Sequence, residues 1–290
     1  MTVFLRKQRT LTRPVQVNGF GFWSGRDVCV EFRPAPPDAG LTFVRVDLDP
    51  VVRIPALVYN RIEVPRRTTL TSGGVRVEMV EHVLAACAGL QLDNCEIWVN
   101  EAEMPGFDGS SWPFVEALLS AGLTDQAATR KQLVVTHTLR VGDHSSWIAA
   151  HPRSGGLFID YQLDYGPGPI GRQSLDLEVT CDHFVQQLAR ARTFLTVAEA
   201  EWLRQSGLGS RVTYRDLLVI GEQGPIENQL IYADECVRHK TLDVLGDLAL
   251  VGCDIVGRIV AYRSGHRLNA DLGALLLAAQ AQREEIRLSA

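Results

Sequence analysis

Residues 238–247 read RHKTLDVLGD and carry the clearest structural signal in the chain. At about 100° per residue, His239, Asp243 and Asp247 fall within roughly 80° of arc on one side of a helix. Apolar residues such as Val244 and Leu245 fall on the opposite side. The stretch therefore predicts an amphipathic helix, over about residues 234–250, that packs through one face and presents polar side chains on the other.

Strands and helices alternate on both sides of this helix. The other expected strands are residues 28–32, 41–46, 95–99, 133–141, 147–150, 156–165, 217–220 and 258–261, and the other helices are 78–90, 113–121, 183–190 and a closing one. The same order recurs in both halves of the chain. It predicts an α+β fold of two similar domains, residues 1–125 and 131–290, each a layer of helices against a mixed β-sheet. The polar segment 126–130 is the expected linker.

Composition excludes several classes of protein. The chain has 290 residues, 46% hydrophobic and 22% charged, with a net charge of −5. This balance gives no general attraction to nucleic acid, so a phosphate-bearing ligand would need a few local cations. No run approaches the roughly 18 apolar residues of a membrane span, so we expect no stable membrane insertion. The six cysteines never form C-x-x-C, which is typical of reduced thiols in a cytoplasmic protein.

The polar face of the 234–250 helix suits a metal ion. His239 and Asp243 lie four residues apart, a spacing at which an imidazole and a carboxylate can bind one zinc ion. His82, on the expected 78–90 helix, supplies a second imidazole, and Glu81 beside it supplies a carboxylate that could take a proton from water. Taken alone, each of these patterns also fits a solvated helix face.

A further histidine follows a strand in the run Ser264-Gly265-His266, where a loop could aim its ring into a cleft. There His266 could donate a proton to a leaving amine, although an isolated loop histidine is also a common solvated residue. The sequence lacks the motifs of other enzyme classes that bind nucleotides or hydrolyse esters and peptides. Residues 19–25 hold one residue too many for G-x-G-x-x-G, and the chain contains no P-loop, no G-x-S-x-G and no H-E-x-x-H.

Several segments, in order and across nearly the whole chain, resemble one known family. They are VEHVLAA (80–86), DN (93–94), MP (104–105), FDGS (107–110), PFV (113–115), ARTF (191–194), DECVRHKTLD (234–243) and AYRSGHRLN (261–269). Together they resemble the bacterial UDP-3-O-acyl-N-acetylglucosamine deacetylases of lipid A biosynthesis.

The resemblance implies two α+β domains with zinc, or alternatively ferrous iron, in the cleft between them. It implies a zinc-dependent amidohydrolase that removes acetyl from an acylated UDP-amino sugar, and we expect it to act as a monomer. The implied roles are metal ligation by His82, His239 and Asp243, proton transfer by the base Glu81 and by His266 oriented by Asp247, and oxyanion binding by the Thr193 hydroxyl. The residues implied at the substrate and its diphosphate are Lys240, Arg263, Phe194 and Tyr165.

Four places depart from the family pattern. Trp23 stands where the family has histidine, Ser146 where it has a lysine near phosphate, Gly-Pro-Gly-Pro at 166–169 where it has Asn-His-Pro, and Arg211-Val212 where small glycines border the acyl passage. The bulk of Arg211 and Val212 predicts a weaker preference for long acyl chains. Two alternatives therefore stay open: a paralogous deacetylase of another N-acetylated amino sugar or sugar nucleotide, and a non-catalytic regulator that binds metal and sugar nucleotide.

Overall fold

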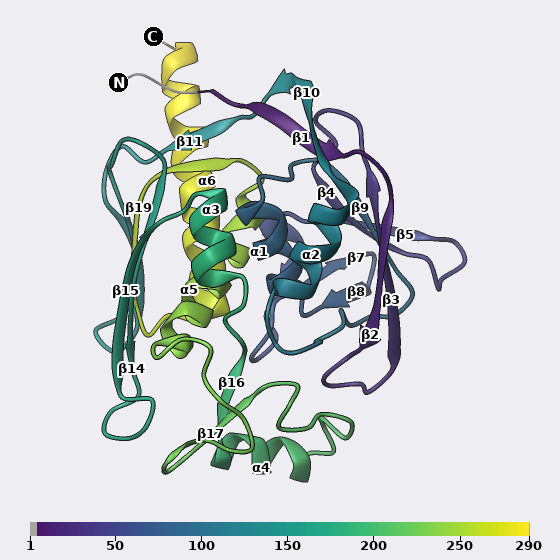
Figure 1. The fold of residues 1–290 in the computed structure, drawn as a ribbon. Coiled ribbons are helices and arrows are strands. Elements are labelled where there is room, and N and C mark those ends of the chain that lie inside the picture. Colours follow the sequence, from purple (N-terminus) through teal and green to yellow (C-terminus); the bar gives the residue numbers. More distant parts are fainter. Residues whose placement is uncertain (1–4, 290) are drawn as a thin grey trace.

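The computed structural model describes residues 5–289, and two mixed sheets form its outer walls (Figure 1). The strand order of the first sheet is β2 (Val15–Phe20), β3 (Asp27–Pro34), β9 (Cys95–Val99), β4 (Leu41–Arg45) and β5 (Val52–Pro55). The order of the second is β12 (Leu139–Gly142), β13 (Trp147–His151), β19 (Asp254–Tyr262), β14 (Leu157–Asp164) and β15 (Arg172–Glu178), with β11 (Gln132–Val134) beside the start of β19.

The two sheets repeat one topology. Each centres on one parallel pair, β4 with β9 and β14 with β19, and its remaining neighbours along this order are antiparallel. In each sheet, the middle strand comes late in the sequence and has one helix before it and one after it. Strand β9 lies between α1 (Glu81–Gly89) and α2 (Trp112–Ala121) in the sequence, and β19 lies between α5 (Glu235–Leu248) and α6 (His266–Ser289). The prediction of two similar α+β domains is confirmed.

All four helices lie between the sheets, so the molecule has a sheet–helix–helix–sheet order (Figure 1). Alternate residues of β3 and β19 are buried, which is the period of a strand with one face on a core. The helices α1 and α5 meet at Gly246, where a Cβ atom would lie 2.1 Å from the backbone oxygen of Glu81. Only glycine permits this approach, and it brings the polar faces of α1 and α5 together.

Two small lobes interrupt the repeat. The first is a three-stranded sheet of β6 (Arg61–Ile62), β7 (Thr69–Ser72) and β8 (Val75–Glu78), which precedes α1. The second consists of β16 (Phe194–Thr196), α4 (Val197–Gln205), β17 (Leu218–Gly221) and β18 (Gly224–Pro225), which precede α5. Both lobes therefore lie next in sequence to the helices that carry the candidate ligands.

Three local expectations are corrected. The expected linker 126–130 lies largely in strand β10 (Leu123–Thr129), which pairs with β1 (Lys7–Leu11); polar residues suit a two-stranded ribbon with little burial as well as they suit a loop. The expected helix 183–190 is a short turn, α3 (Cys181–His183), followed by a π-helical turn at Phe184–Leu188. His266 is the first residue of α6 and not a loop residue. The domain bounds 1–125 and 131–290 stay a prediction.

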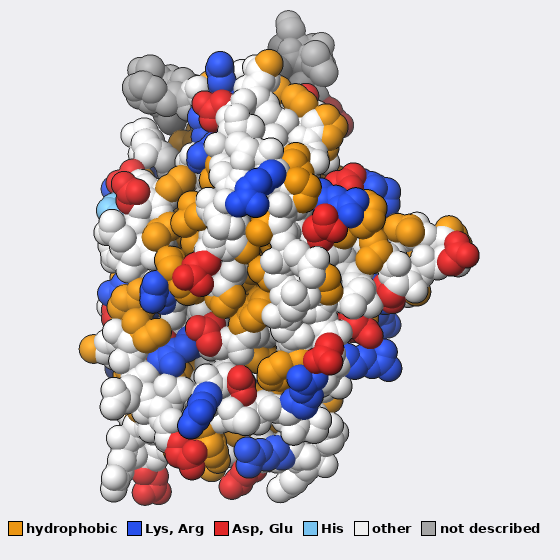
Figure 2. All heavy atoms as spheres, turned by 45° about the vertical axis from the view of Figure 1, so that its right-hand side comes forward, with side chains coloured by type: hydrophobic (Ala, Val, Ile, Leu, Met, Phe, Trp, Pro, Cys, Tyr) orange, Lys and Arg blue, Asp and Glu red, His pale blue; other side chains and the backbone are white. Residues whose placement is uncertain are grey.

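The distribution of charge on the surface agrees with the small net charge of the chain. Acidic and basic side chains are interspersed on the face drawn in Figure 2. None of the helices within residues 5–289 combines the length and apolar character needed to cross a membrane. All six cysteines are free thiols, and Cys87, Cys95 and Cys236 are buried.

Candidate metal centre and active site

Three candidate ligands meet where α1 and α5 pack together. One ligand atom each of His82, His239 and Asp243 lies within 4.8 Å of the other two. The Nε2 atoms of His82 and His239 are 3.8 Å and 3.5 Å from Asp243 Oδ1. All three residues are buried, which excludes the alternative that these polar residues form a solvent-exposed face of their helices. Two imidazoles and a carboxylate are a common protein ligand set of a catalytic zinc site with an open position.

Two details of hydrogen bonding fit a cation at this point. Asp243 Oδ1 is buried and accepts no hydrogen bond from the described residues, an arrangement that is costly unless a cation or water lies there. His239 Nδ1 lies 3.1 Å from the carbonyl oxygen of Ala191, which can only accept a hydrogen bond. The Nδ1 atom therefore carries the proton, and Nε2 keeps its lone pair for a metal.

Electrostatics keep the ligands in the forms that metals bind. Burial, with the charge of His239 second, lowers the pKa of His82 to about 3. Burial also lowers the pKa of His239. Burial alone would raise the pKa of Asp243, but the nearby positive charges together outweigh it, and the pKa falls below its usual range. The largest of these contributions is that of Lys240, whose Nζ lies 2.6 Å from Asp243 Oδ2. The cluster is thus two neutral imidazoles and one carboxylate at neutral pH.

Glu81 lies beside the ligands at the first turn of α1 and is 3% exposed. Its Oε2 accepts a 3.0 Å hydrogen bond from the backbone N–H of Thr68, and its Oε1 lies 3.9 Å from His266 Nε2. Burial raises the pKa of Glu81 to about 7, the nearby carboxylates of Asp247 and Asp243 add to the rise, and His266 opposes it. A carboxylate poised near neutrality can accept a proton and release it again.

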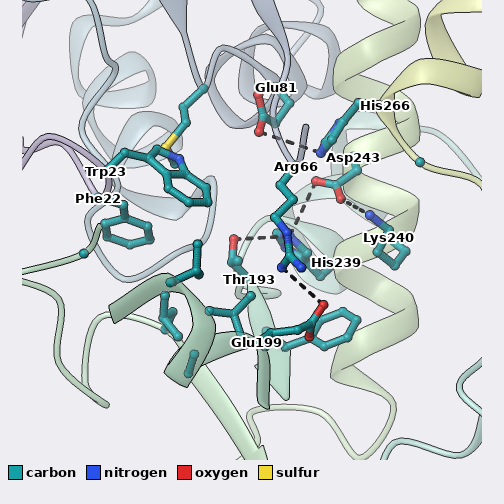
Figure 3. A pocket seen from close by; sticks show the side chains of 18 of the residues that line it. Phe22, Trp23, Arg66, Glu81, Thr193, Glu199, His239, Lys240, Asp243 and His266 are labelled. Carbon is teal, nitrogen blue, oxygen red and sulfur yellow. Dashed lines mark hydrogen bonds and ion pairs between the residues drawn. The ribbon is translucent and has the colours of Figure 1, made fainter. Parts of the chain in front are cut away.

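His266 faces Glu81 from the start of α6 and is held by Asp247. Its Nδ1 lies 2.9 Å from Asp247 Oδ2, and its Nε2 lies 3.9 Å from Glu81 Oε1 (Figure 3). Burial alone would lower the pKa of His266, but the charges of Asp247 and Glu81 raise it to about 9. Asn269 and the Thr68 hydroxyl donate hydrogen bonds to the two oxygens of Asp247. His266 is therefore a protonated, oriented imidazolium.

Thr193 closes the other side of the ligand cluster. Its hydroxyl oxygen lies 3.2 Å from His239 Nε2 and donates to the Gly109 carbonyl oxygen at 3.0 Å. The preceding residue, Arg192, is locked by a buried ion pair to Glu235 at 2.8 Å. The position of Thr193 is thus held by the ion pair of its neighbour Arg192 as well as by its own hydrogen bond to Gly109.

These groups line one side of a cavity of about 460 Å³ between the two halves of the molecule. The sequence-predicted substrate residues Lys240, Arg263, Phe194 and Tyr165 line the same cavity. The rings of Tyr165 and Phe194 meet edge to face with centroids 5.6 Å apart. Asp247 does not line the cavity, because it lies behind His266 and is 1% exposed.

The departures from the family pattern divide into two groups. Trp23, Ser146 and Val212 line the cavity. Arg211 does not: it donates hydrogen bonds to the Gly25 carbonyl and to Asp27, and lies over the Phe20 ring at 4.5 Å. The segment 166–169 also lies outside the lining. The expected bulk in the passage is therefore supplied by Val212 alone.

Sequence reasoning missed three features of the site. Thr68 links Glu81 to Asp247, the Arg192–Glu235 pair fixes Thr193, and Arg66 enters the cavity from the β6–β7 turn. Thr68 and Arg66 belong to a lobe without a periodic pattern, so no spacing signals them. Arg192 could have been found, because it precedes Thr193 within the segment that resembles the family.

A buried three-ligand cluster, an adjacent carboxylate and a histidine–carboxylate pair in one cleft define a metal-dependent hydrolase. The chain belongs to the UDP-3-O-acyl N-acetylglycosamine deacetylase family, whose model matches residues 8–278. It is 39% identical over 276 residues to the UDP-3-O-acyl-N-acetylglucosamine deacetylase of Glaesserella parasuis serovar 5, covering 94% of this chain and 90% of that protein. It is 40% identical over 282 residues to the enzyme of the same name from Idiomarina loihiensis, with the same coverage.

Proposed function

We propose that the protein is a zinc-dependent deacetylase that hydrolyses the acetamide of a UDP-3-O-acyl-N-acetylglucosamine, a step of lipid A biosynthesis. The observation that carries the proposal is the buried group of His82, His239 and Asp243, with an Asp243 oxygen that lacks a donor among the described residues and Glu81 beside it. The family and its named relatives supply the substrate class.

The residues divide the chemistry between them. Zinc, when bound, supplies a Lewis acid that lowers the pKa of water to about 7 and polarises the amide carbonyl. Glu81 accepts the proton of the attacking water, which its raised pKa and its place in the cavity lining support. The Thr193 hydroxyl exchanges its hydrogen bond to the Gly109 carbonyl for one to the carbonyl oxygen of the substrate, and so stabilises the negative charge that develops there.

Breaking the C–N bond needs a second proton. An amide nitrogen leaves readily only when protonated, and His266 holds a proton on Nε2 while Asp247 holds Nδ1. All four substrate residues predicted from the sequence line the cavity, which supports binding of the diphosphate by Lys240 and Arg263 and contacts of the Tyr165 and Phe194 rings with the nucleoside and sugar. Lys240 already forms an ion pair with Asp243, so Arg263, which forms no side-chain hydrogen bond or ion pair within the described residues, is the stronger phosphate ligand of the two.

A second candidate function keeps the chemistry and changes the substrate. Trp23, Ser146 and Val212 all line the cavity, which favours a deacetylase of another N-acetylated amino sugar. Purified protein is incubated with acylated and unacylated UDP-N-acetylglucosamine, and acetate release is followed by mass spectrometry. Fast release from the acylated compound alone supports the first function. Equal release from both supports the second, and no release with full metal content supports a regulator.

A further inference from the structure

Arg66 spans the cavity from one lobe to the other. It lies in the turn before β7, and its Nη1 donates to Glu199 Oε1 of α4 at 3.2 Å (Figure 3). Its guanidinium also lies 5.3 Å from the centroid of the Trp202 ring, one turn further along α4. The backbone of Arg66 has φ of +67°, a left-handed conformation in which glycine would be relaxed and arginine is strained. An unfavoured residue is therefore held where its side chain reaches across the cavity.

Glu199, the partner of Arg66 in this ion pair, is itself held in place by hydrogen bonds. Its Oε2 accepts hydrogen bonds from the N–H and the hydroxyl of Thr196, at 2.9 Å and 3.0 Å, as part of the cap at the start of α4. The carboxylate thus keeps its position whether or not Arg66 is bound. The side chains of Arg66 and Glu199 are 38% and 30% exposed, so the pair remains open to a molecule in the cavity.

The Arg66–Glu199 ion pair lies where the lining of the cavity changes from apolar to polar. Figure 3 places the Arg66 side chain between the rings of Phe22 and Trp23 on one side and the polar groups of Asp243 and Lys240 on the other. Apolar residues of the α4 lobe also line the cavity, among them Leu203, Leu208 and Val212. A molecule with an apolar chain on a polar head must therefore cross Arg66 at its junction.

The guanidinium has unused donors at this junction. An arginine carries five N–H groups, and Arg66 uses one of them within the described residues. A bound molecule that covers these groups must offer an acceptor, since donors shielded from water without a partner cost binding energy. Sites of this kind discriminate against analogues that lack the acceptor.

We propose that Arg66 is a specificity-determining residue that donates a hydrogen bond to the ester carbonyl at the root of the acyl chain. This inference rests on the proposed function, because the 3-O-acyl ester is what joins the apolar chain to the sugar in that substrate. The diphosphate is a more highly charged acceptor in the same molecule, but Arg263 also lines the cavity and forms no side-chain hydrogen bond or ion pair within the described residues, so it can bind the diphosphate.

The test compares two substrates on matched variants. One is the 3-O-acyl ester, and the other is the 3-O-alkyl ether of equal chain length, in which a methylene replaces the carbonyl. Arg66→Gly is the main variant, because glycine relaxes the left-handed backbone and the turn is expected to fold. Arg204→Ala removes another arginine that lines the cavity, one held over the Tyr214 ring, and serves as the control. Metal content and the unfolding midpoint check that each variant is intact.

The ratio of kcat/KM for ester over ether is the readout. We expect Arg66→Gly to lower this ratio by about ten- to a hundredfold, the range for losing a hydrogen bond to a charged donor, and Arg204→Ala to leave it unchanged. An unchanged ratio in an active Arg66→Gly enzyme, or an equal loss on both substrates, overturns the inference while the proposed function stands. Failure of the wild type to release acetate from either substrate overturns both.

Discussion

The α1–α5 helix pair and the two lobes border the same cavity but are held together differently. The helix pair is buried, packs backbone to backbone at Gly246, and carries ligand residues that are at most 5% exposed. The lobes meet through the partly exposed Arg66–Glu199 ion pair, the kind of contact that contributes little to stability. The candidate metal ligands and Glu81 are thus on the rigid part, whereas Arg66 and Glu199 are on the part that tolerates change.

The largest effects should come from the helix pair. His82→Ala, His239→Ala and Asp243→Ala each remove one of three ligands, so we expect loss of most bound zinc and a fall in turnover of about 10⁴-fold or more. Zinc is measured by mass spectrometry of the purified proteins. His151→Ala is the control, because this partly buried histidine contacts Thr138 away from the cavity. Full zinc occupancy in all three ligand variants would refute the metal site.

Loss of the proton-transfer groups should separate turnover from metal binding. Glu81→Gln and His266→Ala keep all three ligands, so zinc content stays near that of the wild type while kcat falls by about 10²- to 10⁴-fold. Steady-state acetate release measures kcat. An active Glu81→Gln enzyme would mean that another group accepts the proton.

Asp247→Asn should move the pH profile. The proposed mechanism needs ionised Glu81 and protonated His266, so we expect activity to rise with pH through about 7 and to fall through about 9. The Asp247 charge raises both pKa values, and its removal therefore moves both limbs to lower pH, by about one to three units for His266. A bound cation lowers both values further without changing this direction. A profile of kcat/KM against pH that keeps its alkaline limb would show that Asp247 does not set the His266 pKa.

The helix pair and the lobes also differ in how much of each could be predicted from the sequence. The spacing of His239, Asp243 and Asp247 fixes one helix face, and this prediction is confirmed because helical period is a local property of the chain. That His82 lies against this face depends on the packing of α1 and α5, which no local pattern encodes. Resemblance to a family supplied that step.

The lobes were predicted least well. Helix α4 was not predicted, and Arg66 was not singled out, because short elements joined by turns have no sustained period. The outcome for Arg211 and Val212 shows a further limit. Sequence places both at the passage, but only a structure shows that Arg211 turns outward to Asp27 while Val212 faces the cavity.

Gly246→Ala should test the rigidity of the helix pair directly. The added methyl group would meet the Glu81 backbone oxygen at 2.1 Å, so α1 and α5 must separate, at a cost of about 1–3 kcal/mol in the free energy of unfolding. Gly273→Ala on α6 is the matched control, since its nearest neighbour is a Val251 methyl at 3.3 Å and the helix gains propensity. Urea denaturation measures both variants. Equal stability of the two would contradict the close packing at Gly246.

The smallest effect is expected at the wall of the apolar passage, where Arg211 and Val212 can be separated. Val212 faces the cavity, so Val212→Ala should create room for part of an acyl chain. Burial of one methylene contributes about 0.8 kcal/mol, so accommodating one more carbon changes kcat/KM by about fourfold. Arg211→Ala should not alter chain-length preference, because Arg211 is bound to Gly25 and Asp27 outside the cavity. A series of substrates with increasing acyl length measures both variants against the wild type. If Arg211→Ala shifts the preferred length and Val212→Ala does not, the passage runs on the outer side of this segment and the α4 lobe must open differently to admit the chain.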